Sequence, residues 1–547
     1  MAMNEQSRGQ CELVIAMEWT LMLAAAVCLC LSLVYWYLTR NNNFFAKRGV
    51  PFLPPTLLVG NMGPLFARKT AVSDHVRDMY DHLDRHPVGG IFQFLQPMFM
   101  IRDPALVRLV TVKDFEHFVD LPILIPEDAE PILTKNLQAL KGQKWKDMRS
   151  TLSPAFTSSK MRLLFSLVSE IGQQMTSYLD AMLQERQAAG EQTDDPTDIL
   201  PLEMKDLSTK YTNDVIATSA FGIKCDTLAN PNNDFYKMGK EFTKVTFLKF
   251  LIFTLYSLLP KVMKALGLRM IPKKVSDFFR SLVRNSIKVR EKEGIVRPDM
   301  IHLLMQVRDN DLRDEPTETS ALQTDKKMSL DIDDIAAQAL VFFSAGFEVV
   351  AVLLSFASTL LAVHQDVQER AREEIDEILA KYDGQVTYEA IQSMKQVDNV
   401  LSETLRIYPP APIISRKCVK KYQVPNSDII FEPEDIVTIP LRGLQLDSQY
   451  FPDPDTFNPD RFSDEHKHNI QPFTYIPFGS GPRQCIANRF ALMVTKTALV
   501  HLLHHFELHT CSKTKLPLQL AKSFTFSFEG GFWVGLKSRS HHHEAEV

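Results

Sequence analysis

The feature that most constrains this chain is a cysteine held in a glycine-rich turn ahead of an apolar, helix-patterned stretch. Cys485 closes the sequence Phe-Gly-Ser-Gly-Pro-Arg-Gln-Cys, and residues 488–504 follow with helical spacing. Such a turn projects the sulfur outward, and the positive end of the following helix favours the thiolate, the form of cysteine that binds metals. A lone cysteine is more often a small buried hydrophobic side chain, and this alternative stays open for Cys485 at this point.

The turn also carries the spaced residues of the motif F-x-x-G-x-R-x-C, at Phe478, Gly481, Arg483 and Cys485. With them the chain resembles the cytochrome P450 monooxygenases over nearly its whole length, and most closely the microsomal, xenobiotic-metabolising members of animals, insects in particular. The resemblance implies a mainly α-helical fold with small β-sheets and an N-terminal transmembrane helix. It implies haem b (iron protoporphyrin IX) as cofactor, Cys485 as the axial iron ligand, and Phe478 and Arg483 as haem contacts. A thiolate ligand pushes electron density onto haem iron and favours O–O cleavage.

Composition narrows the class of protein. The chain has 547 residues and a formal net charge of −5 at pH 7, which argues against nucleic acid as the main partner. Its seven cysteines are odd in number and scattered, which does not fit a disulfide framework, so the catalytic part is expected to face the cytosol. Because no linker-like composition divides the chain, we expect one large helical domain after a short anchor.

The N-terminal region is predicted to anchor the chain in a membrane. Residues 19–38 contain no charged side chain and are long enough, at about 1.5 Å per residue, to span the ~30 Å hydrocarbon core. The cations that follow place the C-terminal side in the cytoplasm. A cleaved signal peptide is the alternative, but no small-x-small cleavage site follows. We expect a luminal N-terminus (1–18), an anchor (19–38), a proline-containing hinge (39–60), a haem-thiolate catalytic domain (61–537) and a flexible tail (538–547). The resemblance implies the endoplasmic reticulum membrane.

Hydrophobic periodicity predicts mostly helix with short strands. Residues 91–95 and 98–101 have strand character and are expected to turn at Gln96-Pro97. The polar residues 309–327 are the expected disordered loop. Residues 333–363 form the longest helical pattern and are apolar on most sides, so this helix should cross the interior.

Two charged motifs are predicted to meet in one network. Glu403 and Arg406 lie at i and i+3 of a helix, so they share a face. Alone, this pair would be an exposed ion pair of little energetic value. Together with Arg461 in the sequence Pro-Asp-Arg-Phe, it resembles the E-x-x-R and P-x-R-F elements of the family. The resemblance implies a buried structural network behind the haem, in which the loss of one partner strands a charge.

Further haem contacts follow from the resemblance. Trp145 and Arg149 share one helical face, with the spacing of the family motif W-x-x-x-R, and the resemblance implies that both hold a haem propionate. Arg416 resembles a third propionate-binding arginine. Outside the family context, Trp145 and Arg149 would form a surface aromatic–cation pair.

Two further segments indicate contacts beyond the haem. Lys141, Lys144 and Lys146 form a positive patch, which the resemblance assigns to docking of NADPH–cytochrome P450 reductase, with cytochrome b5 as a further candidate partner. A merely solvated helix face is the alternative. Residues 250–259 are apolar but too short to span a bilayer. They are expected either as a buried helix or as a segment that dips into the membrane surface.

The sequence Ser-Ala-Gly-Phe-Glu-Val-Val, starting at Ser344, resembles the family's oxygen-activation motif A/G-G-x-D/E-T. The resemblance implies that Ala345 and Gly346 leave room for O2 beside the haem and that Glu348 keeps the acid. Val349 replaces the threonine, and it has no hydroxyl to bond oxygen or relay a proton. We expect partial uncoupling, or rescue by Ser344, a water or a substrate hydroxyl. The alternative is that Val349 only packs the helix and the missing hydroxyl has no consequence.

Substrate contacts are expected by region only, in segments rich in aromatic and aliphatic residues: 121–125, 342–343, 411–414 and 523–526. The sequence thus predicts a membrane-anchored monooxygenase that oxidises lipophilic small molecules, such as plant toxins or insecticides, with O2 and NADPH-derived electrons. Two alternatives stay open. One is a reductase-independent peroxide isomerase or dehydratase, which Val349 favours, and the other is a non-catalytic haem- or ligand-binding protein.

Overall fold

The structure is a computed structural model that describes residues 2–84, 86–122, 130–189, 199–244, 246–258, 260–297, 299–309, 330–523 and 526–539. Several predicted features lie wholly or partly outside these residues: the loop 309–327, the pocket segments 121–125 and 523–526, and the tail 538–547. For the positions outside, the sequence-based expectations stand as predictions.

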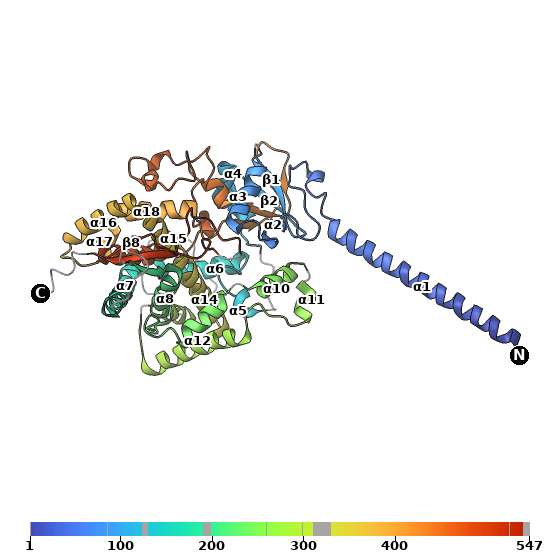
Figure 1. Cartoon of the computed structure of the whole chain (residues 1–547), viewed down its shortest axis with the longest axis horizontal. Helices are drawn as coiled ribbons and strands as arrows, with labels where there is room; N and C mark the ends of the chain where they lie inside the picture. The colour runs from blue at the N-terminus through green and yellow to red at the C-terminus, as the bar shows by residue number, and fades with distance from the viewer. Residues whose placement is uncertain are drawn as a thin grey trace.

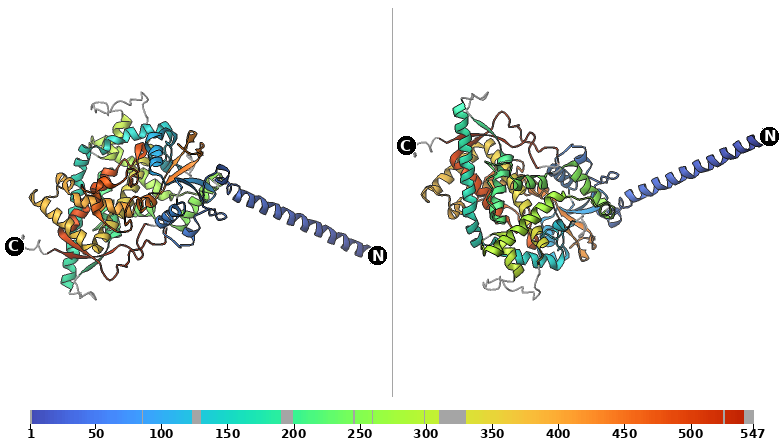
Figure 2. Two further views of the ribbon diagram at one scale, coloured as in Figure 1. Left: turned by 90° about the horizontal axis from the view of Figure 1, so that it is seen from above. Right: turned by 90° about the horizontal axis from the view of Figure 1, so that it is seen from below.

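One long helix projects from a mostly helical body. α1 covers Ala2–Thr39 and appears in Figure 1 as an isolated rod that projects from the body. Figure 2 shows the same projection from above and from below. Within α1, Ile15–Thr39 is long and apolar enough to cross a membrane, and it is not buried against the body. The helix therefore contains the predicted anchor and continues beyond it at both ends.

The described part of the body is built mainly from α-helices. In the N-terminal half these are α2 (Gly63–Phe66), α3 (Val72–His82), α4 (Pro104–Arg108), α5 (Pro131–Thr134), α6 (Gly142–Leu152), α7 (Ser158–Ala189), α8 (Met204–Ile216), α9 (Asp234–Thr243), α10 (Phe247–Leu258) and α11 (Pro260–Ala265). In the C-terminal half they are α12 (Lys273–Glu293), α13 (Met300–Asp309), α14 (Ile332–Ser344), α15 (Val350–Val363), α16 (Gln365–Ala380), α17 (Tyr388–Ser393), α18 (Lys395–Ile407), α19 (Leu441–Gln445) and α20 (Asn488–His505). The prediction of a mainly α-helical fold is confirmed.

Small sheets accompany the helices. The largest described sheet has the order β1-β2-β7-β4 and consists of Val88–Gln93, Gln96–Ile101, Ile436–Ile439 and Ile414–Lys417. A second sheet has the order β3-β9-β8 and consists of Leu200–Glu203, Trp533–Ser538 and Phe506–His509. β5 (Tyr422–Gln423) pairs with β6 (Ile430–Phe431). The β2–β7 pairing is parallel, whereas the other pairings between named strands are antiparallel.

The first hairpin turns earlier than predicted. Gln93 of β1 pairs with Gln96 of β2, so the turn consists of Phe94 and Leu95 rather than Gln96-Pro97. Phe94 adopts a left-handed φ of 55° there. Pro97 fits inside β2 because the neighbouring strand β7 pairs only from Met98 onward, which leaves no partner for the missing N–H on that side.

A long interrupted helix crosses the core, as predicted for residues 333–363. α14 and α15 are joined by a π-helical turn, η6, at Ala345–Val349. The side chains of α15 are buried almost throughout, which explains the apolar pattern on all faces. At the start of α14, the Asp331 carboxylate accepts from the Asp334 N–H and the Asp334 carboxylate accepts from the Asp331 N–H, a reciprocal cap that fixes the first turn.

α10 and α11 lie on the side of the body from which α1 projects (Figures 1 and 2). Leu248, Leu251 and Val262 on these helices are exposed, and so is Leu266 directly after α11. Tyr256 faces inward and is buried. The predicted apolar segment 250–259 is therefore not a wholly buried helix, because one of its faces opens to the surroundings.

Candidate active site

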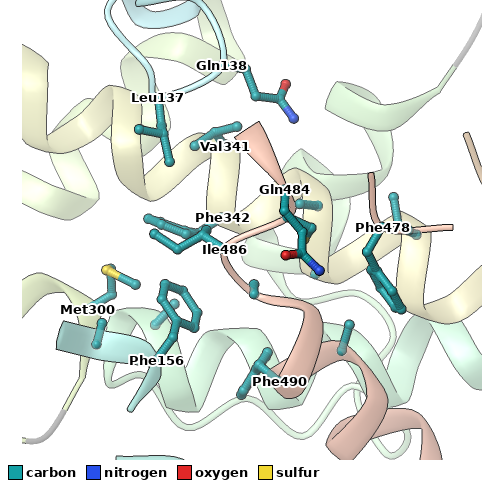
Figure 3. Close-up of a pocket in the computed structure, with 18 of the residues that line it drawn as sticks. Leu137, Gln138, Phe156, Met300, Val341, Phe342, Phe478, Gln484, Ile486 and Phe490 are labelled. Atoms are coloured by element: carbon teal, nitrogen blue, oxygen red, sulfur yellow. The ribbon is translucent and has the colours of Figure 1, made fainter. Parts of the chain in front are cut away.

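A cavity of about 570 Å³ lies between the α14–α15 helix and the loop that carries Cys485. Figure 3 shows Phe478 on one side of it, Met300 and Phe156 on the other, and Phe342 between them. The predicted site residues that line this cavity are Trp145, Arg149, Ala345, Gly346, Val349, Arg416, Phe478, Arg483 and Cys485. Segments from widely separated parts of the sequence therefore place these residues around one space.

Backbone contacts fix the turn before Cys485. The Cys485 N–H donates to the Phe478 carbonyl at 2.9 Å, which closes the loop. Gly481 has a left-handed φ of 71°, and a side chain at this position would overlap the Thr111 carbonyl. Glycine is therefore required both for the conformation and for the close approach. α20 then begins at Asn488.

The Cys485 thiol opens onto the cavity but has protein on its other sides. Burial raises the pKa of this thiol, while the Ala487 N–H and the Arg149 guanidinium lower it. The Ala487 N–H at the start of α20 favours the thiolate, as expected for a helix end, but in the protein alone the loss of hydration outweighs this donor and the nearby cation, so the pKa is raised overall. Coordination to a metal ion deprotonates a thiol outright, so iron binding would favour the Cys485 thiolate despite this burial.

Three arginines meet at the same cavity: Arg149 from α6, Arg416 from β4, and Arg483 from the cysteine turn. The Arg483 guanidinium lies 3.9 Å from the centroid of the Trp145 ring. It also donates to three backbone carbonyls, those of Val119, Leu137 and Leu140. The loop is thereby tied to the chain on both sides of α5.

Among the described residues, these three guanidinium groups have little negative charge beside them. Burial lowers the pKa of all three guanidinium groups, and Arg416 lowers that of Arg483 further. Asp120 approaches Arg483 only to 3.9 Å. The Arg416 Nε has no hydrogen-bond partner among the described residues. A ligand with carboxylate groups would satisfy these donors, and haem with its propionates beside Cys485 fits them.

Glu403, Arg406 and Arg461 lie together in a buried charge network. Arg406 donates to Glu403 through Nε at 2.7 Å and through a second guanidinium nitrogen at 2.8 Å, and both side chains are 0% exposed. The Arg461 Nε lies 3.5 Å from Glu403. Arg406 also donates to the Gln445 carbonyl at 2.9 Å, and the Asn458 N–H donates to Glu403 at 2.9 Å. The exposed ion pair considered as the alternative is therefore wrong.

The π-helical turn η6 forms where another helix presses against the long helix. A side chain at Gly346 would overlap the Ile216 side chain at the end of α8, so the space left by glycine is filled by protein. Ala345 and Gly346 both border the cavity, and the expectation that they leave room for O2 stays a prediction. Thr212 of α8 donates to the Phe347 carbonyl at 2.8 Å, which satisfies an acceptor that the wide turn leaves free.

Neither Glu348, the acid of the oxygen-activation segment, nor the hydroxyl of Ser344 lines the cavity. Val349 lines the cavity and is 44% exposed. Glu348 does not line it and instead forms an ion pair with Lys205 of α8 at 2.8 Å. Ser344, the expected rescue group, also lies outside the lining and donates to the Val341 carbonyl at 3.0 Å. The described residues therefore put no side-chain hydroxyl at the threonine position.

The predicted substrate segments are partly placed in the cavity. Leu121, Phe342, Ala411 and Ile414 line it, whereas Phe343 is fully buried in the core. Sequence reasoning missed a whole part of the lining, contributed by α7, α8, α13 and the turns η4 (Ser153–Phe156) and η5 (Ala217–Phe221): Phe156, Lys160, Leu164, Ile216, Ser219, Met300, His302, Leu303 and Gln306. These residues belong to no motif, and only their tertiary placement reveals them.

Comparison with known proteins agrees with this arrangement. A family model described as Cytochrome P450 matches residues 51–530. Cytochrome P450 9e2 of Blattella germanica is 48% identical over 526 residues, covering 95% of this chain and 98% of that protein. Probable cytochrome P450 9f2 of Drosophila melanogaster is 39% identical over 525 residues, covering 93% and 98%. Cytochrome P450s are oxidoreductases that bind haem b and act as monooxygenases. The chain belongs to the cytochrome P450 family.

Proposed function

We propose that this P450 oxidises lipophilic foreign molecules, such as plant toxins or insecticides, at the endoplasmic reticulum membrane. The observation that carries the proposal is the joint lining of one largely apolar cavity by Cys485, the three arginines and the π-helical turn. Aromatic and aliphatic side chains such as Phe342 and Leu353 make up much of that lining and favour apolar ligands. The similarity to insect P450s of the 9 and 6 groups supports the same class of substrate.

In this proposal the chain holds the haem and shapes its surroundings. Cys485 would bind the iron, Phe478 would contact the haem, and the propionates would lie against Trp145, Arg149, Arg416 and Arg483. The bound haem supplies the activation of O2, which protein side chains alone do not perform. Glu403, Arg406 and Arg461 hold α18 to the loop before the cysteine turn and thereby maintain the site without touching the substrate.

We place the enzyme on the membrane through two surfaces. α1 would span the bilayer with residues 19–38, and the cations after it favour a cytosolic catalytic domain. α10 and α11 lie on the side from which α1 projects, where the exposed leucines and valine of these helices and of the turn after α11 would rest on the bilayer surface. A lipophilic substrate could then reach the protein from the lipid phase.

Electrons would arrive at the opposite face of α6. This helix turns Trp145 and Arg149 toward the cavity and leaves Lys144 exposed to solvent. Lys146 is already paired with Glu116 at 2.9 Å, so Lys144 is the stronger candidate for an acidic partner surface. NADPH–cytochrome P450 reductase would be that partner, and cytochrome b5 could use the same patch.

Cys485→Ser tests the proposal. The wild-type protein should show the red-shifted ferrous carbonyl band of thiolate-ligated haem and should form hydroxylated products from lipophilic probes with NADPH and reductase. The serine variant should lose both while α-helical content by circular dichroism is unchanged. Retention of the band and of turnover in the variant would refute Cys485 as the ligand.

A second candidate activity is favoured by one observation, the valine at position 349. A reductase-independent peroxide isomerase or dehydratase would need the thiolate-bound haem but no relay hydroxyl at Val349. The two activities separate cleanly, because turnover of a lipid hydroperoxide without NADPH or reductase would support the isomerase, whereas strict dependence on both would support the monooxygenase.

A further inference from the structure

Part of the cavity lining comes from a loop rather than from a helix. This segment, the 135–140 loop, follows α5 and precedes α6, and its residues Leu137 and Gln138 line the cavity. Figure 3 shows both residues, together with Val341 and Phe342 of the long helix. Because a loop lacks the repeating backbone bonds of a helix or strand, its position depends on contacts with other parts of the chain.

Gln338 of α14 binds the backbone of this loop with both ends of its side-chain amide. The Leu137 N–H donates to the Gln338 Oε1 at 2.8 Å, and the Gln338 Nε2 donates to the Lys135 carbonyl at 2.8 Å. Only an amide side chain offers such a donor and acceptor side by side. Gln338 is fully buried and does not line the cavity, so it acts on the loop and not on a ligand.

The cysteine turn holds the same loop. Arg483 donates to the Leu137 carbonyl at 3.4 Å and to the Leu140 carbonyl at 2.9 Å. Leu137 is therefore bonded through its N–H to Gln338 of the long helix and through its carbonyl to the turn that carries Cys485. With its backbone held in both directions, the Leu137 side chain has one defined position in the cavity lining.

A second contact between the loop and α14 is too exposed to replace Gln338. The Lys135 Nζ lies 2.6 Å from Asp331 and 3.1 Å from Asp334. The side chains of Lys135 and Asp331 are 35% and 59% exposed, and ion pairs in contact with water contribute little. Loss of the Gln338 amide, by contrast, leaves the Leu137 N–H buried without a partner, which is costly. The position of the loop against α14 thus depends mainly on Gln338.

From these contacts, and resting on the proposed oxidation of lipophilic molecules in this cavity, we propose that Gln338 is a positioning residue that sets the ligand specificity of the cavity through Leu137. An apolar ligand meets a fixed Leu137 side chain, and ligands of different size then fit unequally well. In an apolar pocket, one methylene more or less changes binding by about tenfold or more. A loop released from α14 would yield to the ligand, so ligands of different size would bind more equally.

The test measures how the haem-loaded, full-length protein discriminates between N-methylimidazole, N-butylimidazole and N-phenylimidazole. The free ring nitrogen of each compound binds ferric haem iron, and the change in absorbance gives a Kd for each. Gln338→Met keeps the length of the side chain but removes its donor and its acceptor. It should move the ratio between the weakest and the tightest Kd by about tenfold toward equal binding, at the haem content of the wild type.

Gln368→Met is the matched control. Gln368 of α16 is also a buried glutamine that binds the backbone of a distant segment, because it donates to the Leu508 carbonyl at 2.7 Å and accepts from the Leu508 N–H at 2.9 Å. It does not line the cavity. Gln368→Met should lower the thermal midpoint as Gln338→Met does, but it should leave the ratio of Kd values unchanged.

Leu137 shows whether the effect travels through the loop. Leu137→Ala should also change the ratio of Kd values, and Gln338→Met added to it should change the ratio little further, because the side chain that the amide positions is gone. If Gln338→Met takes up no haem, Gln338→Glu replaces it in the test. This variant keeps the acceptor for the Leu137 N–H and should give a smaller change in the same direction.

Three results would overturn the positioning role: an unchanged ratio in the Gln338 variant, an equal change in Gln368→Met, or a full additional change when Gln338→Met is added to Leu137→Ala. A wild-type protein that binds all three imidazoles with one Kd would instead contradict the proposed function, because its cavity would not select apolar ligands at all.

Discussion

Removal of the buried carboxylate of Glu403 should destabilise this protein more than removal of either arginine that contacts it. Glu403 accepts two bonds from Arg406 and one from the Asn458 N–H, and Arg461 approaches it to 3.5 Å. Glu403→Gln leaves the fully buried Arg406 guanidinium, and the mostly buried one of Arg461, without an anion. Stranding a buried charge in this way typically costs about 3–5 kcal/mol.

Substitution of either arginine should lower the free energy of unfolding less than Glu403→Gln does. Arg406→Met leaves the carboxylate with Arg461 and with the Asn458 N–H, so its charge is still partly compensated. Arg461 makes only a long contact to Glu403 and also donates to the Asp453 carbonyl at 2.8 Å, so Arg461→Met should cost only about 1 kcal/mol. The double variant Glu403→Met/Arg406→Met should cost less than the sum of its single variants, because no unpaired charge is left.

Heating at one fixed rate, with loss of the haem absorbance as the readout, measures this order. For a domain of residues 51–530, an unfolding entropy of about 2.1 cal/mol/K per residue amounts to roughly 1 kcal/mol/K. A loss of 3–5 kcal/mol therefore lowers the midpoint by about 3–5 °C. Large proteins of this kind unfold irreversibly, so only midpoints at the same heating rate are compared. A midpoint for Arg461→Met as low as that for Glu403→Gln would refute the reasoning.

Three further predictions rest on single residues. Val349→Thr should raise the product formed per NADPH consumed and lower peroxide release, and an unchanged ratio would mean that the missing hydroxyl is inconsequential. Gly346→Ala should lower stability by about 1–3 kcal/mol because its methyl meets Ile216, and adding Ile216→Val should restore part of the midpoint. Burial raises the pKa of Asp214 from 3.8 to about 6, so the folded protein binds this proton more tightly than the unfolded chain does. The free energy of unfolding should therefore fall by about 3 kcal/mol as the pH rises from 3.8 to about 6 and above, and Asp214→Asn should flatten this dependence in thermal scans.

The parts of this molecule that the sequence predicts well depend on spacing along one element. Residues 19–38 were predictable as one helix because an uncharged segment of membrane length is recognised without tertiary information, and these residues lie within α1. Trp145 and Arg149 both reach the cavity because a separation of four places them on one face of α6. Glu403 and Arg406 are paired for the same reason on α18.

The parts that the sequence does not predict are set by contacts between distant segments. Ile216 fills the space beside Gly346, and no pattern around either residue indicates that contact. The hairpin turn at Phe94 and Leu95 contains neither glycine nor proline, whereas the nearby Pro97 suggests a turn and instead lies in β2. The cysteine turn shows the same limit, because the burial that raises the thiol pKa comes from the whole surrounding fold.

The replacement of threonine by Val349 shows why a motif and its surroundings have to be considered together. In the sequence, the change removes a hydroxyl from a helix, and the neighbouring Ser344 and Glu348 are the obvious substitutes. In the structure, both substitutes are already bound elsewhere, to the Val341 carbonyl and to Lys205. A proton donor must then come from outside the long helix. The departure from the motif thus leaves residues 344–349 of the long helix without a side-chain hydroxyl or acid that lines the cavity.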